Sequence, residues 1–140
     1  MAPGRYELLE HTADLWLRLR GPTPEDIFAN AGWALFNLLT GRETTSGSVA
    51  DVAEIEAADY DELLVHYLNE LLYRFETRRT IFSEFRFEEL TPQRLRVKLF
   101  GERIAPATFV GRFDIKSATY HELRFQRTAD GYEASIILDI

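Results

Sequence analysis

The stretch 59–75 constrains the fold most, because it predicts an unbroken helix with a single apolar side. Asp59 is suited to cap its N-terminus, with Glu62 three residues later as the capping-box partner. Helix-forming residues dominate the segment, and neither Pro nor Gly interrupts it. Its apolar side chains recur at helical spacing as one stripe: Leu63, Leu64, Tyr67, Leu68, Leu71, Leu72 and Phe75. Such a stripe has to be buried against another layer of structure.

A second amphipathic helix is expected before it. Thr23 is a good N-cap, Pro24 suits the first helical position, and Gly41 ends the helix. Its apolar residues again fall on one face: Ile27, Phe28, Ala31, Ala34, Leu35, Leu38 and Leu39.

Most of the remaining chain reads as strands, and the clearest of them alternate apolar and polar residues. Strands are expected at 6–10, 14–20, 49–57, 80–90, 94–103, 116–127 and 132–138, with an excursion at 104–112. Asp130-Gly131 closes the last hairpin. The order of elements predicts one α+β domain over residues 1–140. We expect two layers, with both helices packed on one face of a mixed, mostly antiparallel sheet.

Composition narrows the class of protein. A chain of 140 residues without Cys has no disulfide framework and no thiolate metal site. It has neither a signal-peptide pattern nor an apolar run of about 18 residues, so we expect a cytoplasmic protein away from the membrane. A net charge of −7 argues against direct nucleic-acid binding, so we expect any association with RNA to be made through a partner protein. The oligomeric state, including a homo-oligomer, stays open.

Two carboxylates at opposite ends of the chain form the candidate metal site. Asp14 is in phase with the polar side of the strand at 14–20, and Asp139 is out of phase with the more apolar set at 132–138. We hypothesise that they meet in the fold and, with the main-chain carboxylate of Ile140, bind a hard cation. Calcium takes about 6–8 oxygen ligands. The alternative, which spacing alone favours, is that both are solvated strand ends.

Other polar groups have weaker claims to a functional role. The three histidines, His11, His66 and His121, lack the local spacing of a zinc site. The sequence also contains no Gly-x-Ser-x-Gly elbow and no Gly-rich phosphate loop. His11 is expected to orient the turn before Asp14.

Two further polar stretches each have a functional and an ordinary interpretation. The basic side of the strand at 94–103 is either a docking surface or, as is more usual, a solvated sheet face. Residues 116–121, Lys-Ser-Ala-Thr-Tyr-His, carry a cation, three hydroxyls and an imidazole. They either contact a partner or begin a strand with ordinary polar neighbours.

Four pieces taken together resemble the archease family. They are His11-Thr12-Ala13-Asp14, the helix around Leu68-Asn69-Glu70, the segment 116–121, and Asp139-Ile140. They occur in the family's order over nearly the whole chain. The resemblance implies a calcium-binding protein, or one that binds another divalent cation, that activates a GTP-dependent RtcB-type RNA ligase in tRNA splicing and RNA repair.

The resemblance also assigns residues. The family's first metal-site Asp falls on Asp14, and its C-terminal pair falls on Asp139 and Ile140. Residues expected to support the site or contact the partner are His11, Thr12, Lys116, Tyr120 and His121, with Lys116 the main contact. The expected function is therefore a non-enzymatic activator.

Two other functions stay open. One is a metal-dependent hydrolase, in which Asp14 and Asp139 bind the metal and His11 or His121 acts as general base. The other is a chaperone-like modulator of RNA-modifying enzymes.

Overall fold

The computed structural model describes residues 5–9, 14–105 and 111–140, which form two antiparallel sheets and two helices. The four-stranded sheet has the order β1 (Glu7–Leu9), β2 (Leu15–Gly21), β7 (Gly131–Asp139) and β6 (Ser117–Thr128). The three-stranded sheet has the order β3 (Val49–Glu56), β5 (Arg94–Arg103) and β4 (Thr80–Thr91). The helices are α1 (Pro24–Thr40) and α2 (Tyr60–Arg78). The predicted elements therefore all form where the chain is described.

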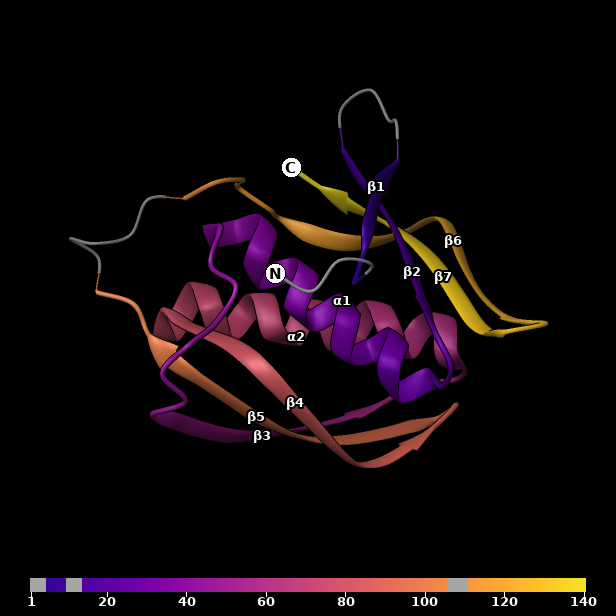
Figure 1. Cartoon of the computed structure of the whole chain (residues 1–140), viewed down its shortest axis with the longest axis horizontal. Coiled ribbons are helices and arrows are strands. Elements are labelled where there is room, and N and C mark those ends of the chain that lie inside the picture. The colour runs from indigo at the N-terminus through magenta and orange to yellow at the C-terminus, as the bar shows by residue number, and fades with distance from the viewer. Residues whose placement is uncertain (1–4, 10–13, 106–110) are drawn as a thin grey trace.

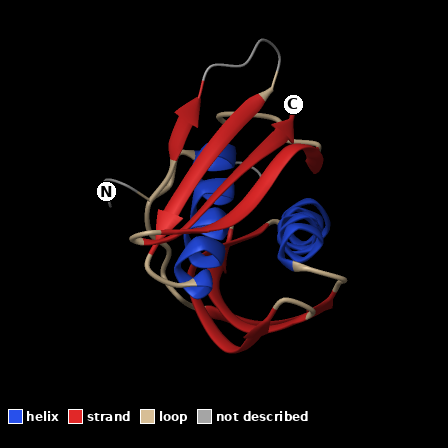
Figure 2. Cartoon of the chain, turned by 90° about the vertical axis from the view of Figure 1, so that its right-hand side faces the viewer, coloured by secondary structure: helices blue, strands red, loops and turns tan. Residues whose placement is uncertain are grey.

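Both helices lie between the two sheets (Figures 1 and 2). Helix α1 contacts β2 and β7 on one side and β4 on the other, and α2 contacts β6 as well as all three strands of the smaller sheet. The α+β class with antiparallel strands is confirmed. The strands, however, divide between two sheets, where the sequence predicted a single sheet with both helices on one face.

The burial of α1 explains this difference. Every residue from Ala31 to Leu39 is buried, including Trp33, Phe36 and Asn37, which lie outside the predicted apolar stripe. A helix covered on several sides needs more than one layer around it. Neither described helix is long and apolar enough to cross a membrane.

The helix starts follow the predicted caps, with one correction. Thr23 caps α1 and Asp59 caps α2, where the Asp59 side chain accepts a hydrogen bond from the Glu62 N–H at 2.9 Å. The Glu62 carboxylate does not return to Asp59 as predicted. It accepts from the Ala58 N–H at 3.2 Å, one residue earlier, which satisfies a donor just outside the helix.

Aromatic side chains fill the space between the helices and both sheets. Tyr67 of α2 is fully buried, and its hydroxyl donates to the Phe28 carbonyl of α1 at 2.9 Å. The Phe28 ring lies 5.4 Å from that of Tyr67 and 5.9 Å from that of Phe125 in β6, measured between centroids. This cluster ties α1 both to α2 and to the larger sheet.

Candidate functional site

The two ends of the chain converge on the four-stranded sheet. Strands β2 and β7 pair antiparallel, and their register sets Leu15 opposite Leu138. Asp14 directly precedes Leu15 and Asp139 directly follows Leu138, so both occupy the same end of two neighbouring strands (Figure 1). Strand pairing thus places the two acidic residues that the sequence analysis singled out at neighbouring strand ends.

A third strand completes this end of the sheet. The register of β6 against β7 sets Ser117 opposite Asp139, and the Lys116 N–H donates to the Asp139 carbonyl at 2.8 Å. Ile140 follows with 39% of its surface exposed. We call Asp14, Lys116, Asp139 and Ile140 the strand-end cluster.

The oxygens of the strand-end cluster fit a hard cation in type. Asp14 and Asp139 carry carboxylate oxygens and Ile140 carries main-chain oxygen, and oxygen is the ligand atom that calcium prefers. Within the described ranges, no three His, Cys, Asp or Glu side chains come together as a metal site. A calcium ion at this end would therefore need further oxygen ligands, from water or from a partner, to complete its shell.

Tyr120 and His121 lie in an irregular part of β6 beside the cluster. The pairing with β7 is interrupted between Thr119 and Arg124, and Glu122 within this bulge has a φ of 52°. Tyr120 is 55% exposed, and burial of its hydroxyl together with the nearby Glu62 carboxylate raises its pKa. The bulge therefore leaves Tyr120 exposed at the surface rather than paired within the sheet.

The remaining histidines and Thr12 are placed differently. His11 and Thr12 lie outside the described residues. His66 is exposed on α2, on the helix that covers β6 rather than in the sheet that carries Asp14 and Asp139.

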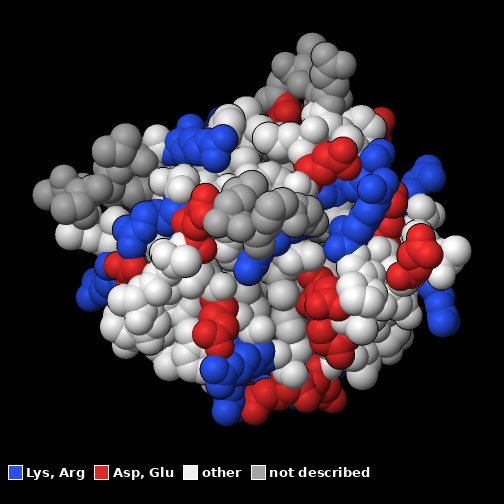
Figure 3. Space-filling model, viewed as in Figure 1, with Lys and Arg blue, Asp and Glu red and all other residues white. Residues whose placement is uncertain are grey.

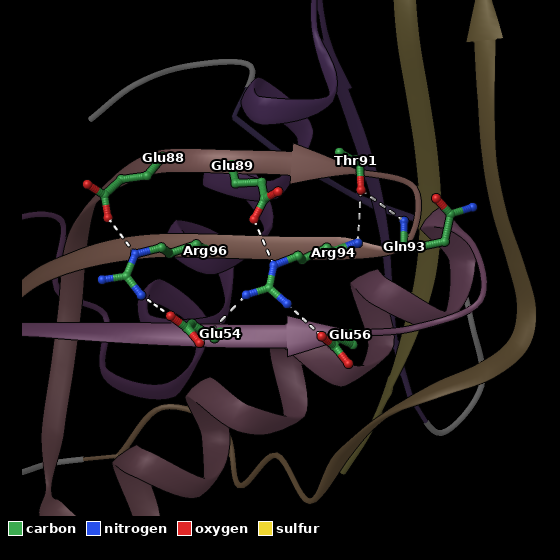
Figure 4. Close-up of polar contacts among 8 residues, drawn as sticks. All are labelled: Glu54, Glu56, Glu88, Glu89, Thr91, Gln93, Arg94 and Arg96. Carbon is green, nitrogen blue, oxygen red and sulfur yellow. Dashed lines mark hydrogen bonds and ion pairs between the residues drawn. The ribbon is translucent and has the colours of Figure 1, made fainter.

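The basic row of β5 is neutralised by its neighbours in the sheet. Arg94 donates to Glu89 of β4 at 2.8 Å and to Glu56 of β3 at 2.6 Å, and Arg96 bridges Glu88 and Glu54 in the same way (Figure 4). We call these six residues the charge ladder. Its pairing supports the interpretation as a solvated sheet face, since its cations are already matched by carboxylates.

Acidic and basic side chains are also interspersed elsewhere. Figure 3 shows them next to each other across one whole face of the molecule. A cavity of about 590 Å³ at the C-terminal ends of the helices is lined by Arg79, Arg112, Glu76 and Asp114 among others. Because both signs line it, the cavity's charge selects neither anions nor cations.

One polar residue near the cluster was missed by the sequence analysis. Asn69 of α2 accepts a hydrogen bond from the Ala118 N–H at 2.7 Å and donates to the Ala118 carbonyl at 3.2 Å. The sequence analysis included Asn69 in the helix that resembles the archease family but gave it no role, because it reads only as an amide beside the apolar stripe, next to Leu68.

Comparisons with known proteins point to one protein family. A model of the Archease protein family matches residues 6–140. Protein archease of Methanosarcina acetivorans is 36% identical over 140 residues, covering 97% of this chain and 96% of that protein. Protein archease of Pyrococcus furiosus is 31% identical, covering 97% of this chain and 99% of that protein.

Two solved structures share the fold. The solution structure of Methanobacterium thermoautotrophicum protein 1598 is 26% identical with a TM-score of 0.81, covering 98% of this chain and 99% of that one. The crystal structure of an archease, possible chaperone, from Thermotoga maritima is 18% identical with a TM-score of 0.67, covering 96% of each chain, and shows the fold alone.

Proposed function

Because this chain belongs to the archease family, we propose that it is a non-enzymatic, metal-binding activator of an RtcB-type, GTP-dependent RNA ligase. In this role it promotes guanylylation of the ligase and its turnover in tRNA splicing and RNA repair. The observation that carries the proposal is the strand-end cluster, where pairing of Leu15 with Leu138 sets Asp14 beside Asp139.

The strand-end cluster is the part of the chain that would meet the ligase. Asp14, Asp139 and the Ile140 carboxylate would hold calcium or another divalent cation, which when bound supplies positive charge next to the ligase active site. Their carboxylates suit the positively charged pocket expected around a bound nucleotide. Lys116, whose N–H is tied to Asp139, is the expected partner contact on the same end.

The overall charge supports an indirect link to RNA. A chain with a net charge of −7 lacks the positive footprint that phosphate backbones require. In this proposal the ligase recognises the RNA, and this chain adjusts the ligase active site.

The test measures ligase guanylylation with GTP and calcium, with and without this chain. We expect wild type to accelerate formation of the histidine–guanylate adduct and Asp139→Ala to lose the acceleration while remaining folded. Glu56→Ala is the matched control, because Glu56 is an exposed strand-end carboxylate of the charge ladder, 74% exposed in its side chain. Full activation by Asp139→Ala would refute the role of the strand-end cluster.

The same preparation addresses the two other functions. A metal-dependent hydrolase would turn over phosphate esters or carboxylic esters without the ligase, whereas an activator would not. A chaperone-like modulator would recover RNA-modifying enzymes other than the ligase in a pull-down from its own cells.

A further inference from the structure

A side-chain amide of helix α2 forms hydrogen bonds with the edge strand β6. The Asn69 carboxamide both accepts from the Ala118 N–H, at 2.7 Å, and donates to the Ala118 carbonyl, at 3.2 Å. A carboxamide carries the same donor and acceptor as a peptide group, so it pairs with Ala118 as a neighbouring strand would. It thereby caps the open edge of the sheet at this residue.

The opposite side of the same short segment holds the end of β7. Lys116 donates its N–H to the Asp139 carbonyl at 2.8 Å, and the Thr119 hydroxyl donates to the Ile137 carbonyl at 3.0 Å. Residues 116–119 are therefore held between Asn69 on one side and the last residues of β7 on the other.

From these contacts we propose that Asn69 is a positioning residue for the strand-end cluster, an inference that rests on the proposed function. By holding Ala118 it keeps Lys116 and Ser117 against Asp139, and so keeps the Asp139 end of β7 beside β2 and Asp14. Preorganised ligands bind a cation more tightly than ligands that must be ordered at the moment of binding.

A second anchor on the same helix provides the control. Burial raises the pKa of the Asp61 carboxyl, and its contact with the Phe125 backbone, further along β6, opposes that shift. The bulge between Thr119 and Arg124 separates the part of β6 held by Asp61 from the part held by Asn69. Both residues fasten β6 to α2, but Asn69 alone of the two lies next to the strand-end cluster.

The experiment compares Asn69→Ala with Asp61→Ala in the full chain. Amide hydrogen exchange without metal should accelerate over residues 116–119 in Asn69→Ala and stay at the wild-type rate there in Asp61→Ala. Calorimetric titration with calcium chloride should show about tenfold weaker affinity for Asn69→Ala, the lower end of the loss seen for groups that orient metal ligands. Wild-type exchange at 116–119 in Asn69→Ala, or equal calcium affinity in the two variants, would overturn the inference.

Ligase activation separates positioning from a general loss of structure. Asn69→Ala should need about tenfold more calcium for half-maximal activation yet reach the wild-type maximum, because its ligands are intact but less ordered. A lowered maximum at saturating calcium would contradict positioning.

Two further outcomes would distinguish a failure of this inference from a failure of the proposed function. If wild type itself binds no calcium, the proposed metal role fails, and hydrogen exchange alone decides whether Asn69 orders the cluster. If Asn69→Ala does not fold, Asn69→Asp keeps the acceptor for the Ala118 N–H and loses the donor. Faster exchange at 116–119 in that variant supports the inference, and wild-type exchange rejects it.

Discussion

The strand-end cluster and the charge ladder both place carboxylates on β-strands, but they leave them in different surroundings. In the ladder, Glu54, Glu56, Glu88 and Glu89 each meet Arg94 or Arg96 from the central strand (Figure 4). In the cluster, Asp139 follows the last described strand pair, and the part of the chain that the structure describes makes no ion pair with its carboxylate. Its carbonyl, by contrast, is tied to Lys116.

The difference teaches that the number of acids in a region does not identify a cation site. The ladder holds more carboxylates than the cluster, yet its charge is cancelled within the sheet. An exposed ion pair adds about 0.2–1 kcal/mol to the free energy of unfolding, so the role of the ladder is to stabilise the fold. At Asp139, by contrast, a cation would balance the carboxylate without competing with any Arg of the described residues.

The largest effect is expected on calcium binding, when the Asp139 carboxylate of the strand-end cluster is removed. Asp139→Ala should weaken calcium binding by at least about 100-fold, since removal of a ligand costs at least as much as loss of an orienting group. Its free energy of unfolding should change by less than about 0.5 kcal/mol, as for other surface substitutions. Calorimetric titration and urea unfolding give the two values, and Glu56→Ala should keep wild-type calcium affinity. Equal affinities would erase the distinction between the two regions.

The next effect comes from the core, where one buried tyrosine is expected to add to the fall in stability at alkaline pH. Burial raises the pKa of Tyr67 well above its ordinary value of 10.0. The stability contributed by the neutral hydroxyl is therefore complete below pH 10 and is lost as pH rises from there towards the folded-state pKa.

Tyr67→Phe tests this assignment. It should lower the free energy of unfolding by about 1.5 kcal/mol at pH 7, through loss of the hydrogen bond to Phe28. It should also flatten the fall in stability above pH 10. Urea unfolding at pH 7, 10 and 11 measures both; a slope identical to that of wild type would assign the alkaline sensitivity to other groups.

A smaller effect probes the ladder at its most connected residue. Arg94 lies 2.6 Å from Glu56, 2.8 Å from Glu89 and 3.9 Å from Glu54. Arg94→Met keeps the apolar stem and should cost about 1 kcal/mol of unfolding free energy, reflecting a network of exposed pairs. The cost should shrink in 1 M NaCl, because salt screens exposed charges. Calcium affinity should be unchanged, and a loss of affinity would couple the two regions.

The smallest effect is expected at the margin of the ladder. Among the described residues, Lys98 forms an ion pair with Glu88 alone, at 3.5 Å, and half of its side chain is exposed. Lys98→Met should therefore change the free energy of unfolding by less than about 0.5 kcal/mol. Thermal and urea unfolding beside Arg94→Met would measure the contrast, and an equal cost for both would show that the ladder is not organised around Arg94.

Local chemistry was readable from the sequence because it depends on neighbours in the chain. Thr23 and Asp59 cap their helices as expected, and alternation marks β2, β5 and β7. The strand ends at Asp14 and Asp139 were located in the same way. What alternation reports is which face of a strand is buried, not which strand lies beside it.

Local sequence patterns do not predict the long-range contacts that form the site. Asn69 meets Ala118 across 49 residues of chain, and an amide beside an apolar stripe has no pattern that names its partner. The division into two sheets likewise follows from the full burial of α1 rather than from any strand's own sequence.

The amino-acid sequence by itself determined the helices, most strand boundaries and the placement of carboxylates at strand ends, since spacing and capping act over a few residues. Only the tertiary structure decided that β2 and β7 pair, that Asp14 and Asp139 therefore lie side by side, and that Asn69 holds the third strand against them. Hydrogen bonds between strands are satisfied by many alternative partners, and the packing of the whole core selects one arrangement among them.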